Sequence, residues 1–198
     1  MMKKPHVIIF SGYGLNTEDE TKAAFEHSGA SVDIIHLNDI IAKPTVLKKT
    51  QVVVFPGGFS YGDHTGAGKA YGNRVRQHLG KAIEEFLARD TLMIGICNGF
   101  QIITSVGILP GALVANDIPR YHTRWVDLEV QKESPWLKGI KTLSLPIAHG
   151  EGKYYAPPST FALLSKGSLL APRLGDVNAA TFPSHSPYVA SKANSIAL

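Results

Sequence analysis

The chain has 198 residues, 44% of them hydrophobic and 18% charged, so it can bury one sizeable core, and we expect a single domain over residues 1–198. Its 20 basic and 16 acidic residues give a net charge of +4 without the basic cluster that marks nucleic-acid binding. A single cysteine excludes an internal disulfide and a cysteine-based zinc site, and no apolar run suits a signal peptide or a membrane span. We therefore expect a cytoplasmic protein that binds neither nucleic acid nor membrane and holds no metal.

Three short apolar runs early in the chain are typical of buried strands, because they are rich in β-branched residues and bounded by glycine, proline or polar residues. They cover residues 6–10, 31–37 and 51–55. Between the first two runs, Thr17 and Glu20 have the spacing of a capping box and predict a helix that ends before Gly29. The first two strands and this helix form a β-α-β unit.

A longer helix is predicted over about residues 69–89, where the apolar residues fall on one stripe. They are Tyr71, Val75, Leu79, Ala82, Ile83, Phe86 and Leu87. Residues 91–96 follow as another strand, and strands that alternate with helices favour a mostly parallel sheet covered on both faces. The alternating residues 125–130 and 142–148 predict a small antiparallel extension.

The only cysteine, Cys97, lies between Gly95 and Gly99, at the turn from the strand over 91–96 to a short helix predicted over 100–106. This arrangement is typical of a nucleophile elbow, in which a sharp turn strains the backbone and brings the flanking residues so close that only glycine leaves room. The N–H groups and the dipole of a helix N-terminus stabilise a thiolate there. A lone cysteine is commonly a small buried hydrophobe, but this position favours a nucleophile.

A second glycine-rich stretch, residues 56–70, follows the strand over 51–55. Loops that follow parallel strands gather at one edge of the sheet, so we expect this loop to face Cys97 and to aim N–H groups at a developing oxyanion. Its Gly68-Lys69 pair superficially suggests a phosphate loop. We reject that interpretation, because five residues instead of four separate the motif glycines and Ala70 replaces Ser or Thr.

A third stretch, residues 145–155, places His149 and Glu151 between glycines after a strand. From spacing alone, these side chains form an acid–base pair or belong to a polar turn. Both interpretations stay open at this level.

Three stretches in this order carry a resemblance to a known family: PGGFSYGD at 56–63, GICNGFQI at 95–102 and PIAHGEGKYY at 146–155. With GYGLNTEDET at 12–21 and RWVDLEV at 124–130, they resemble the glutaminase subunits of phosphoribosylformylglycinamidine synthase, which are class I glutamine amidotransferases. The resemblance implies an α/β fold, a flavodoxin-like three-layer sandwich with a mostly parallel central sheet. It also implies hydrolysis of glutamine to glutamate and ammonia, for the conversion of formylglycinamide ribonucleotide into its amidine in purine biosynthesis.

The resemblance assigns a role to residues in each stretch. Cys97 is the expected nucleophile. The oxyanion hole is expected from the N–H of Asn98 together with that of Gly57 or Gly58. The residues expected to bind the substrate glutamine are Gln101, His149, Gly150 and Glu151.

The sequence departs from the family in one place. The triad histidine and glutamate, normally a Pro-His-Pro-Glu string near the C-terminus, are missing: the last glutamate is Glu151 and the last histidine is His185. The C-terminal part therefore looks truncated, and we expect these residues alone to turn over glutamine poorly. His185 is a weak substitute, because no Asp or Glu follows it.

Free ammonia is lost to solvent, so the resemblance implies a complex with a large synthetase subunit, which uses ATP and Mg²⁺, and a small bridging subunit. This chain is expected to need no cofactor of its own. Two other interpretations stay open. A DJ-1/PfpI-like cysteine hydrolase or stress protein shares the sheet and the elbow cysteine, although that group often has His where this chain has Asn98 and lacks GGFSYGD. A noncatalytic amidotransferase-like subunit would keep the fold only to dock on a synthetase.

Overall fold

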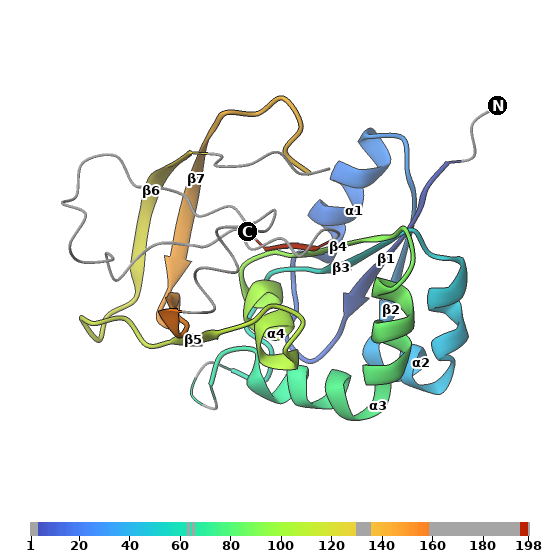
Figure 1. Ribbon diagram of the computed structural model, residues 1–198, viewed down its shortest axis with the longest axis horizontal. Helices are drawn as coiled ribbons and strands as arrows, with labels where there is room; N and C mark the ends of the chain where they lie inside the picture. The colour runs from blue at the N-terminus through green and yellow to red at the C-terminus, as the bar shows by residue number, and fades with distance from the viewer. Residues whose placement is uncertain (1–3, 63, 65, 130–135, 159–194, 198) are drawn as a thin grey trace.

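The computed structural model describes residues 4–62, 64, 66–129, 136–158 and 195–197. Its main sheet has five parallel strands in the order β2-β1-β3-β4-β9 (Figure 1). These strands are β1 (His6–Ser11), β2 (Ser31–His36), β3 (Val52–Phe55), β4 (Leu92–Gly95) and β9 (Ser195–Ala197). This is the strand order of flavodoxin-like folds, so the expected fold class is confirmed.

Helices connect the parallel strands. They are α1 (Glu18–His27), α2 (Leu37–Ala42), α3 (Lys69–Leu87) and α4 (Asn98–Val106), with a 3-10 helix, η1, at Pro44–Lys49. The sequence predicted α1, α3 and α4. The helix α3 is long enough to show a helical period, and α1 and α4 are each followed by a glycine that indicates where the helix ends. It missed α2 and η1, because six residues are too few to show a helical period.

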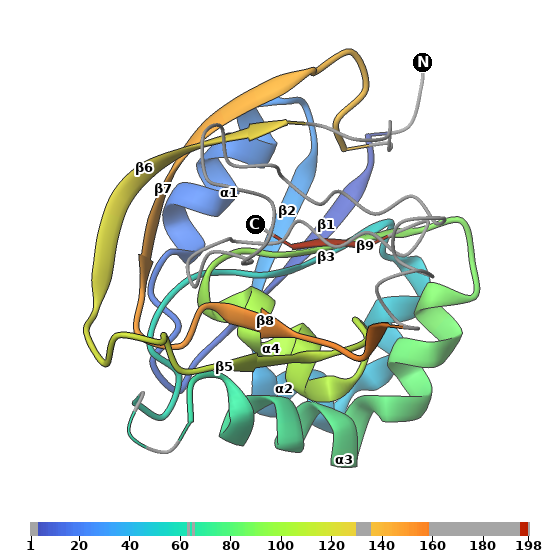
Figure 2. The same cartoon turned by 60° about the vertical axis from the view of Figure 1, so that its left-hand side comes forward.

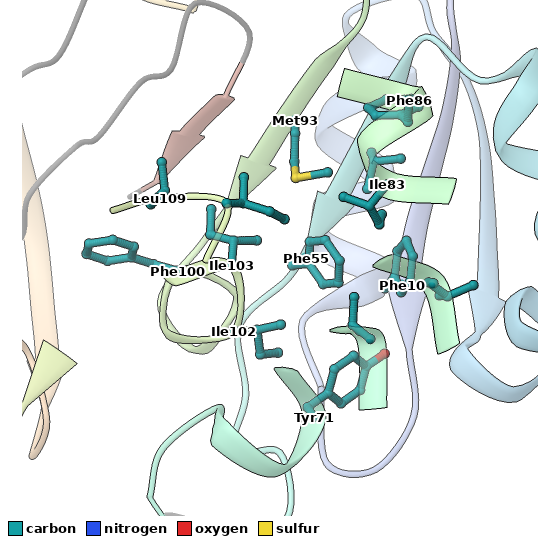
Figure 3. Packing of buried hydrophobic residues seen from close by; sticks show 14 of the residues in the cluster. Phe10, Phe55, Tyr71, Ile83, Phe86, Met93, Phe100, Ile102, Ile103 and Leu109 are labelled. Carbon is teal, nitrogen blue, oxygen red and sulfur yellow. The ribbon is translucent and has the colours of Figure 1, made fainter. Parts of the chain in front are cut away.

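The core lies on both faces of the sheet, because successive strand residues point to opposite sides. Ile8 and Phe10 of β1 face the layer formed by α2, α3 and α4, whereas Val7 and Ile9 face the opposite side. The rings of Phe10 and Phe55 stack with centroids 4.3 Å apart. Figure 3 shows this core, in which the sheet packs on α3 and α4 through Phe10, Phe55, Met93, Tyr71, Ile83, Phe86, Ile102 and Ile103.

Two antiparallel pairs lie beside the main sheet (Figure 2). The longer pair joins β6 (His122–Glu129) to β7 (Thr142–His149), which confirms the predicted extension. Val126 and Ile147 from this pair are buried in the same cluster as Val7 and Ile9, so the pair and α1 cover this face of the sheet. The shorter pair, β5 (Ala112–Val114) with β8 (Lys153–Tyr155), was not predicted, because three residues show no period.

None of the helices in the described part of the chain is long and apolar enough to cross a membrane. Those same described ranges contain no group of three or more His, Cys, Asp or Glu side chains placed to hold a metal ion. His185 lies outside the described residues.

Candidate active site

Cys97 occupies the turn between β4 and α4 with φ 51° and ψ −109°, a strained conformation for a residue with a side chain. A Cβ on Gly95 would lie 2.7 Å from the carbonyl oxygen of Gly99, and a Cβ on Gly99 would lie 1.8 Å from that of Phe55. Both glycines are therefore required by close backbone contacts. The predicted elbow is confirmed, and because Cys97 is exposed, its interpretation as a buried hydrophobe is wrong.

Two backbone N–H groups near the elbow, those of Asn98 and Gly58, donate no hydrogen bond within the part of the chain that the structure describes. The N–H of Gly57, by contrast, donates to Oγ1 of Thr17 at 2.8 Å. A Cβ on Gly57 would lie only 3.6 Å from the Cβ of Cys97, so this loop borders Cys97. Of the two glycines that the sequence left open as oxyanion donors, Gly57 thus already has an acceptor for its N–H, and Gly58 has none in the described ranges.

The predicted capping box at the start of α1 is wrong. Thr17 is the N-cap residue, but its side chain makes no capping hydrogen bond, because its hydroxyl oxygen accepts the N–H of Gly57 instead. The helix still begins at Glu18, and the acidic residues of its first turn suit the positive end of the dipole.

A chain of hydrogen bonds joins the three motif stretches at this edge of the sheet. Oδ1 of the fully buried Asn98 accepts the N–H of Ser60 at 3.0 Å, and its Nδ2 donates to Oε1 of Gln101 at 2.8 Å. Nε2 of Gln101 donates to the backbone oxygen of Glu151 at 2.8 Å. Oε2 of Glu151 accepts the N–H of Ala67 at 3.2 Å. The structure thus brings together the loop after β3, the elbow helix and the 149–151 loop.

The 149–151 loop is organised by Asn116, which is itself buried. Nδ2 of Asn116 donates to the backbone oxygens of Arg120 and His149, both at 2.9 Å, and its Oδ1 lies 2.9 Å from Nδ1 of His149. Because both amide hydrogens go to carbonyls, Nδ1 of the ring is the donor in its contact with Oδ1 of Asn116. The backbone oxygen of Gly150 accepts the N–H of Asn116 at 3.0 Å.

His149 and Glu151 are thus held by different neighbours, Asn116 and Ala67. This arrangement supports a polar binding loop over an acid–base pair. In the glycine-rich loop, whose Gly68-Lys69 pair superficially suggests a phosphate loop, the N–H of Ala67 donates to the carboxylate of Glu151 in the same chain.

Three polar residues of the site were not found from the sequence: Thr17 was interpreted as a helix cap, and Ser60 and Asn116 received no role. Each has a partner 33 to 40 residues away. Local patterns carry no signal for such contacts.

Residues 4–185 match the sequence model of the CobB/CobQ-like glutamine amidotransferase domain. The subunit PurQ of phosphoribosylformylglycinamidine synthase from Dehalococcoides mccartyi is 38% identical over an alignment of 205 positions that covers 98% of this chain and 78% of that protein. The subunit from Methanococcus maripaludis (strain C7) is 42% identical over 173 residues, 82% of this chain and 64% of that protein. The structure of PurLQS from Thermotoga maritima matches with a TM-score of 0.74 and 27% identity over 98% of this chain and 85% of that one.

The fold and the elbow site therefore define a glutamine amidotransferase domain. More narrowly, the chain belongs to the family of PurQ subunits of phosphoribosylformylglycinamidine synthase, as its sequence motifs predicted. It spans 62 to 64% of the length of the Methanococcus maripaludis relatives. The match over residues 4–185 sets aside the DJ-1/PfpI-like interpretation.

Proposed function

We propose that this chain is a glutaminase subunit that releases ammonia from glutamine for phosphoribosylformylglycinamidine synthase. One observation carries the proposal: an exposed cysteine on a strained elbow borders the loop of Gly57 and Gly58, and the backbone N–H groups of Asn98 and Gly58 donate no hydrogen bond in the described part of the chain. Strain of this kind persists only where the surrounding structure imposes it, and it clusters at functional sites.

The thiolate of Cys97 attacks the side-chain carbonyl carbon of glutamine, and the π electron pair moves onto the oxygen. The N–H groups of Asn98 and Gly58 stabilise this oxyanion, and each such donor is typically worth about 10² to 10³ in rate. Collapse of the intermediate expels the nitrogen, which takes up a proton and leaves as ammonia, and a γ-glutamyl thioester remains. Water then attacks the thioester, which releases glutamate and restores the thiol.

The proton that reaches the leaving nitrogen needs a carrier, which in the family is the triad histidine. Residues 159–194, with His185, lie outside the described ranges, so the structure describes no candidate there. His149 serves the 149–151 binding loop in this proposal, since its Nδ1 already donates to Asn116. With Gln101, Gly150 and Glu151 it lines the position of the substrate glutamine.

The ammonia passes to a large synthetase subunit, which converts formylglycinamide ribonucleotide into its amidine with ATP and Mg²⁺, in a complex that includes a small bridging subunit. The likeness to a chain of PurLQS from Thermotoga maritima supports these partners. This chain itself uses no cofactor, and the complex is cytoplasmic.

The test is the intact mass of the full chain after exposure to a diazoketone analogue of glutamine, with and without excess glutamine. We expect one adduct on the wild type, suppressed by glutamine, and none on Cys97→Ser. Ammonia release is then measured with the synthetase subunit present. Absence of labelling on a folded wild type, alone and in the complex, would contradict the proposal and support a subunit that only docks.

A further inference from the structure

The loop after β1 runs antiparallel along the loop after β3, which contains Gly57 and Gly58. Three backbone hydrogen bonds join them: Asn16 N–H to Gly57 O at 3.1 Å, Phe59 N–H to Gly14 O at 2.8 Å, and Tyr61 N–H to Tyr13 O at 2.9 Å. The two backbones are too close for an added side chain, because a Cβ on Gly58 would lie 2.5 Å from the oxygen of Gly14. The backbone of the loop after β1 therefore restricts the conformations open to the loop after β3.

Two tyrosines, one from each loop, pack the loops against each other. Tyr13 and Tyr61 both have positive φ angles, 57° and 58°, and each such conformation costs about 1 to 3 kcal/mol. Their rings stack with centroids 4.8 Å apart, and the guanidinium of Arg74 lies 5.0 Å from the centroid of Tyr13. The phenol of Tyr13 donates to Oδ1 of Asn38 at 2.7 Å. These contacts offset the backbone strain and fix the two loops against each other.

Thr17 follows these residues, and here a side chain instead of a backbone group bonds to the loop after β3. Its Oγ1 accepts the N–H of Gly57 at 2.8 Å, which directs that N–H toward α1. The next N–H along the chain, that of Gly58, donates no hydrogen bond in the part of the chain that the structure describes. The Gly57–Gly58 peptide is held through its oxygen, which accepts the N–H of Asn16, whereas the preceding Pro56–Gly57 peptide is held by Thr17. Because glycine has a wide choice of backbone angles, Gly57 itself does little to fix these two peptides relative to each other.

We propose that Thr17 is a positioning residue for glutamine hydrolysis: its hydroxyl holds the N–H of the Pro56–Gly57 peptide, and thereby the backbone at Gly57, so that the N–H of Gly58, and not that of Gly57, completes the oxyanion hole. This role rests on the function proposed above. An oxyanion exists only after the thiolate attacks, so loss of the positioning hydroxyl lowers kcat and leaves KM for glutamine nearly unchanged.

The experiment uses the full chain in complex with the synthetase subunit and compares three variants. Thr17→Val keeps the shape and removes the acceptor, and we expect kcat for ammonia release to fall by about 10- to 100-fold, with KM within about threefold, because one oxyanion donor is misplaced part of the time. Thr17→Ser restores the hydroxyl and is expected to recover most of kcat. Thr21→Val is the matched control, because among the described residues its hydroxyl bonds only to the backbone oxygen of Thr17, one helical turn away, at 2.6 Å.

Two further readouts separate positioning from a general loss of structure. Alkylation of Cys97 by iodoacetamide creates no oxyanion, so its rate is expected to stay unchanged in Thr17→Val. The amide of Gly57 is expected to lose protection from hydrogen exchange in Thr17→Val and to keep it in Thr17→Ser.

The outcomes distinguish this role from the function on which it rests. Wild-type kcat in Thr17→Val, or an equal loss in Thr17→Val and Thr17→Ser, overturns the role of Thr17 alone. A fall in kcat matched by a fall in the alkylation rate overturns it as well. A wild-type complex that releases no ammonia overturns the proposed function together with this role.

Discussion

The side-chain oxygen of Asn98 accepts a hydrogen bond at 3.0 Å from the backbone N–H of Ser60, and both residues are buried. The substitution Asn98→Ala leaves this N–H without an acceptor and Oε1 of Gln101 without a donor. We expect the free energy of unfolding to fall by about 1 to 3 kcal/mol, the usual penalty for a buried group left unsatisfied. Urea denaturation measures it.

A second variant, Asn98→Asp, separates the two hydrogen bonds of this side chain. The carboxylate still accepts from Ser60 but offers no donor to Gln101. Gln101 must then turn its amide, which places its oxygen against the backbone oxygen of Glu151. We expect diazoketone labelling of Cys97 to fall in both variants. Labelling at the wild-type rate in either would contradict the role of this network in the site.

The substitution Gly99→Ala tests the contact that allows the elbow to close. Its Cβ would lie 1.8 Å from the carbonyl oxygen of Phe55, a backbone atom that moves only with β3. We expect destabilisation of at least about 3 kcal/mol, at the upper end for overpacking, in thermal or urea unfolding. Gly80→Ala is the matched control: it lies within α3 with nothing within 4 Å, and it should stabilise by about 0.5 to 1 kcal/mol. Equal effects would contradict the predicted clash.

The backbone strain at Cys97 predicts an opposition between stability and reactivity. Glycine accepts φ 51° without the penalty of about 1 to 3 kcal/mol that a side chain incurs, although it adds entropy to the unfolded chain. Because the exposed thiol contributes little packing, we expect Cys97→Gly to raise the free energy of unfolding by about 1 kcal/mol and to abolish labelling. Cys97→Ala keeps the Cβ and the strain. A stabilisation as large in Cys97→Ala would show that backbone strain is not the cause.

Burial raises the pKa of Tyr71 well above its usual value of 10.0. Above pH 10 the unfolded chain therefore loses this proton while the folded chain keeps it, so the contribution of Tyr71 to stability is complete below pH 10 and declines above it, by up to about 1.4 kcal/mol per pH unit. Tyr71→Phe removes this part of the alkaline loss. At pH 7 it costs about 1 kcal/mol, because the hydrogen bond to the backbone oxygen of Ser11 is lost.

Urea unfolding at pH 7 and at several values above pH 10 measures both effects of Tyr71→Phe. Tyr155→Phe, at a side chain that is 63% exposed, is the control and should leave the stability at pH 7 nearly unchanged. An alkaline loss that is identical in wild type and Tyr71→Phe would contradict the assignment.

The predicted elements that proved right are those with a strong local signal. Residues 6–10 and 51–55 are continuous β-branched runs, and the stripe from Tyr71 to Phe86 repeats with the helical period, so β1, β3 and α3 follow from the chain itself. The predicted Thr17 capping box is wrong for the opposite reason. Its residue types fit a local motif, but the hydroxyl of Thr17 accepts the N–H of Gly57, 40 residues away, instead of an N–H of its own helix.

The sequence by itself determined the parallel sheet, the elbow and the family of this protein, because strand and helix periods and the frame of glycines around Cys97 are set by neighbours in the chain. Only the tertiary structure decided how the site is assembled. The bond of the Gly57 N–H to Thr17, the burial of Asn98 between two loops and the contact of Asn116 with His149 depend on hydrogen bonds that exist only once distant loops meet. Polar contacts of this kind are directional and short, so they become defined when the hydrophobic layers have fixed the ends of the strands.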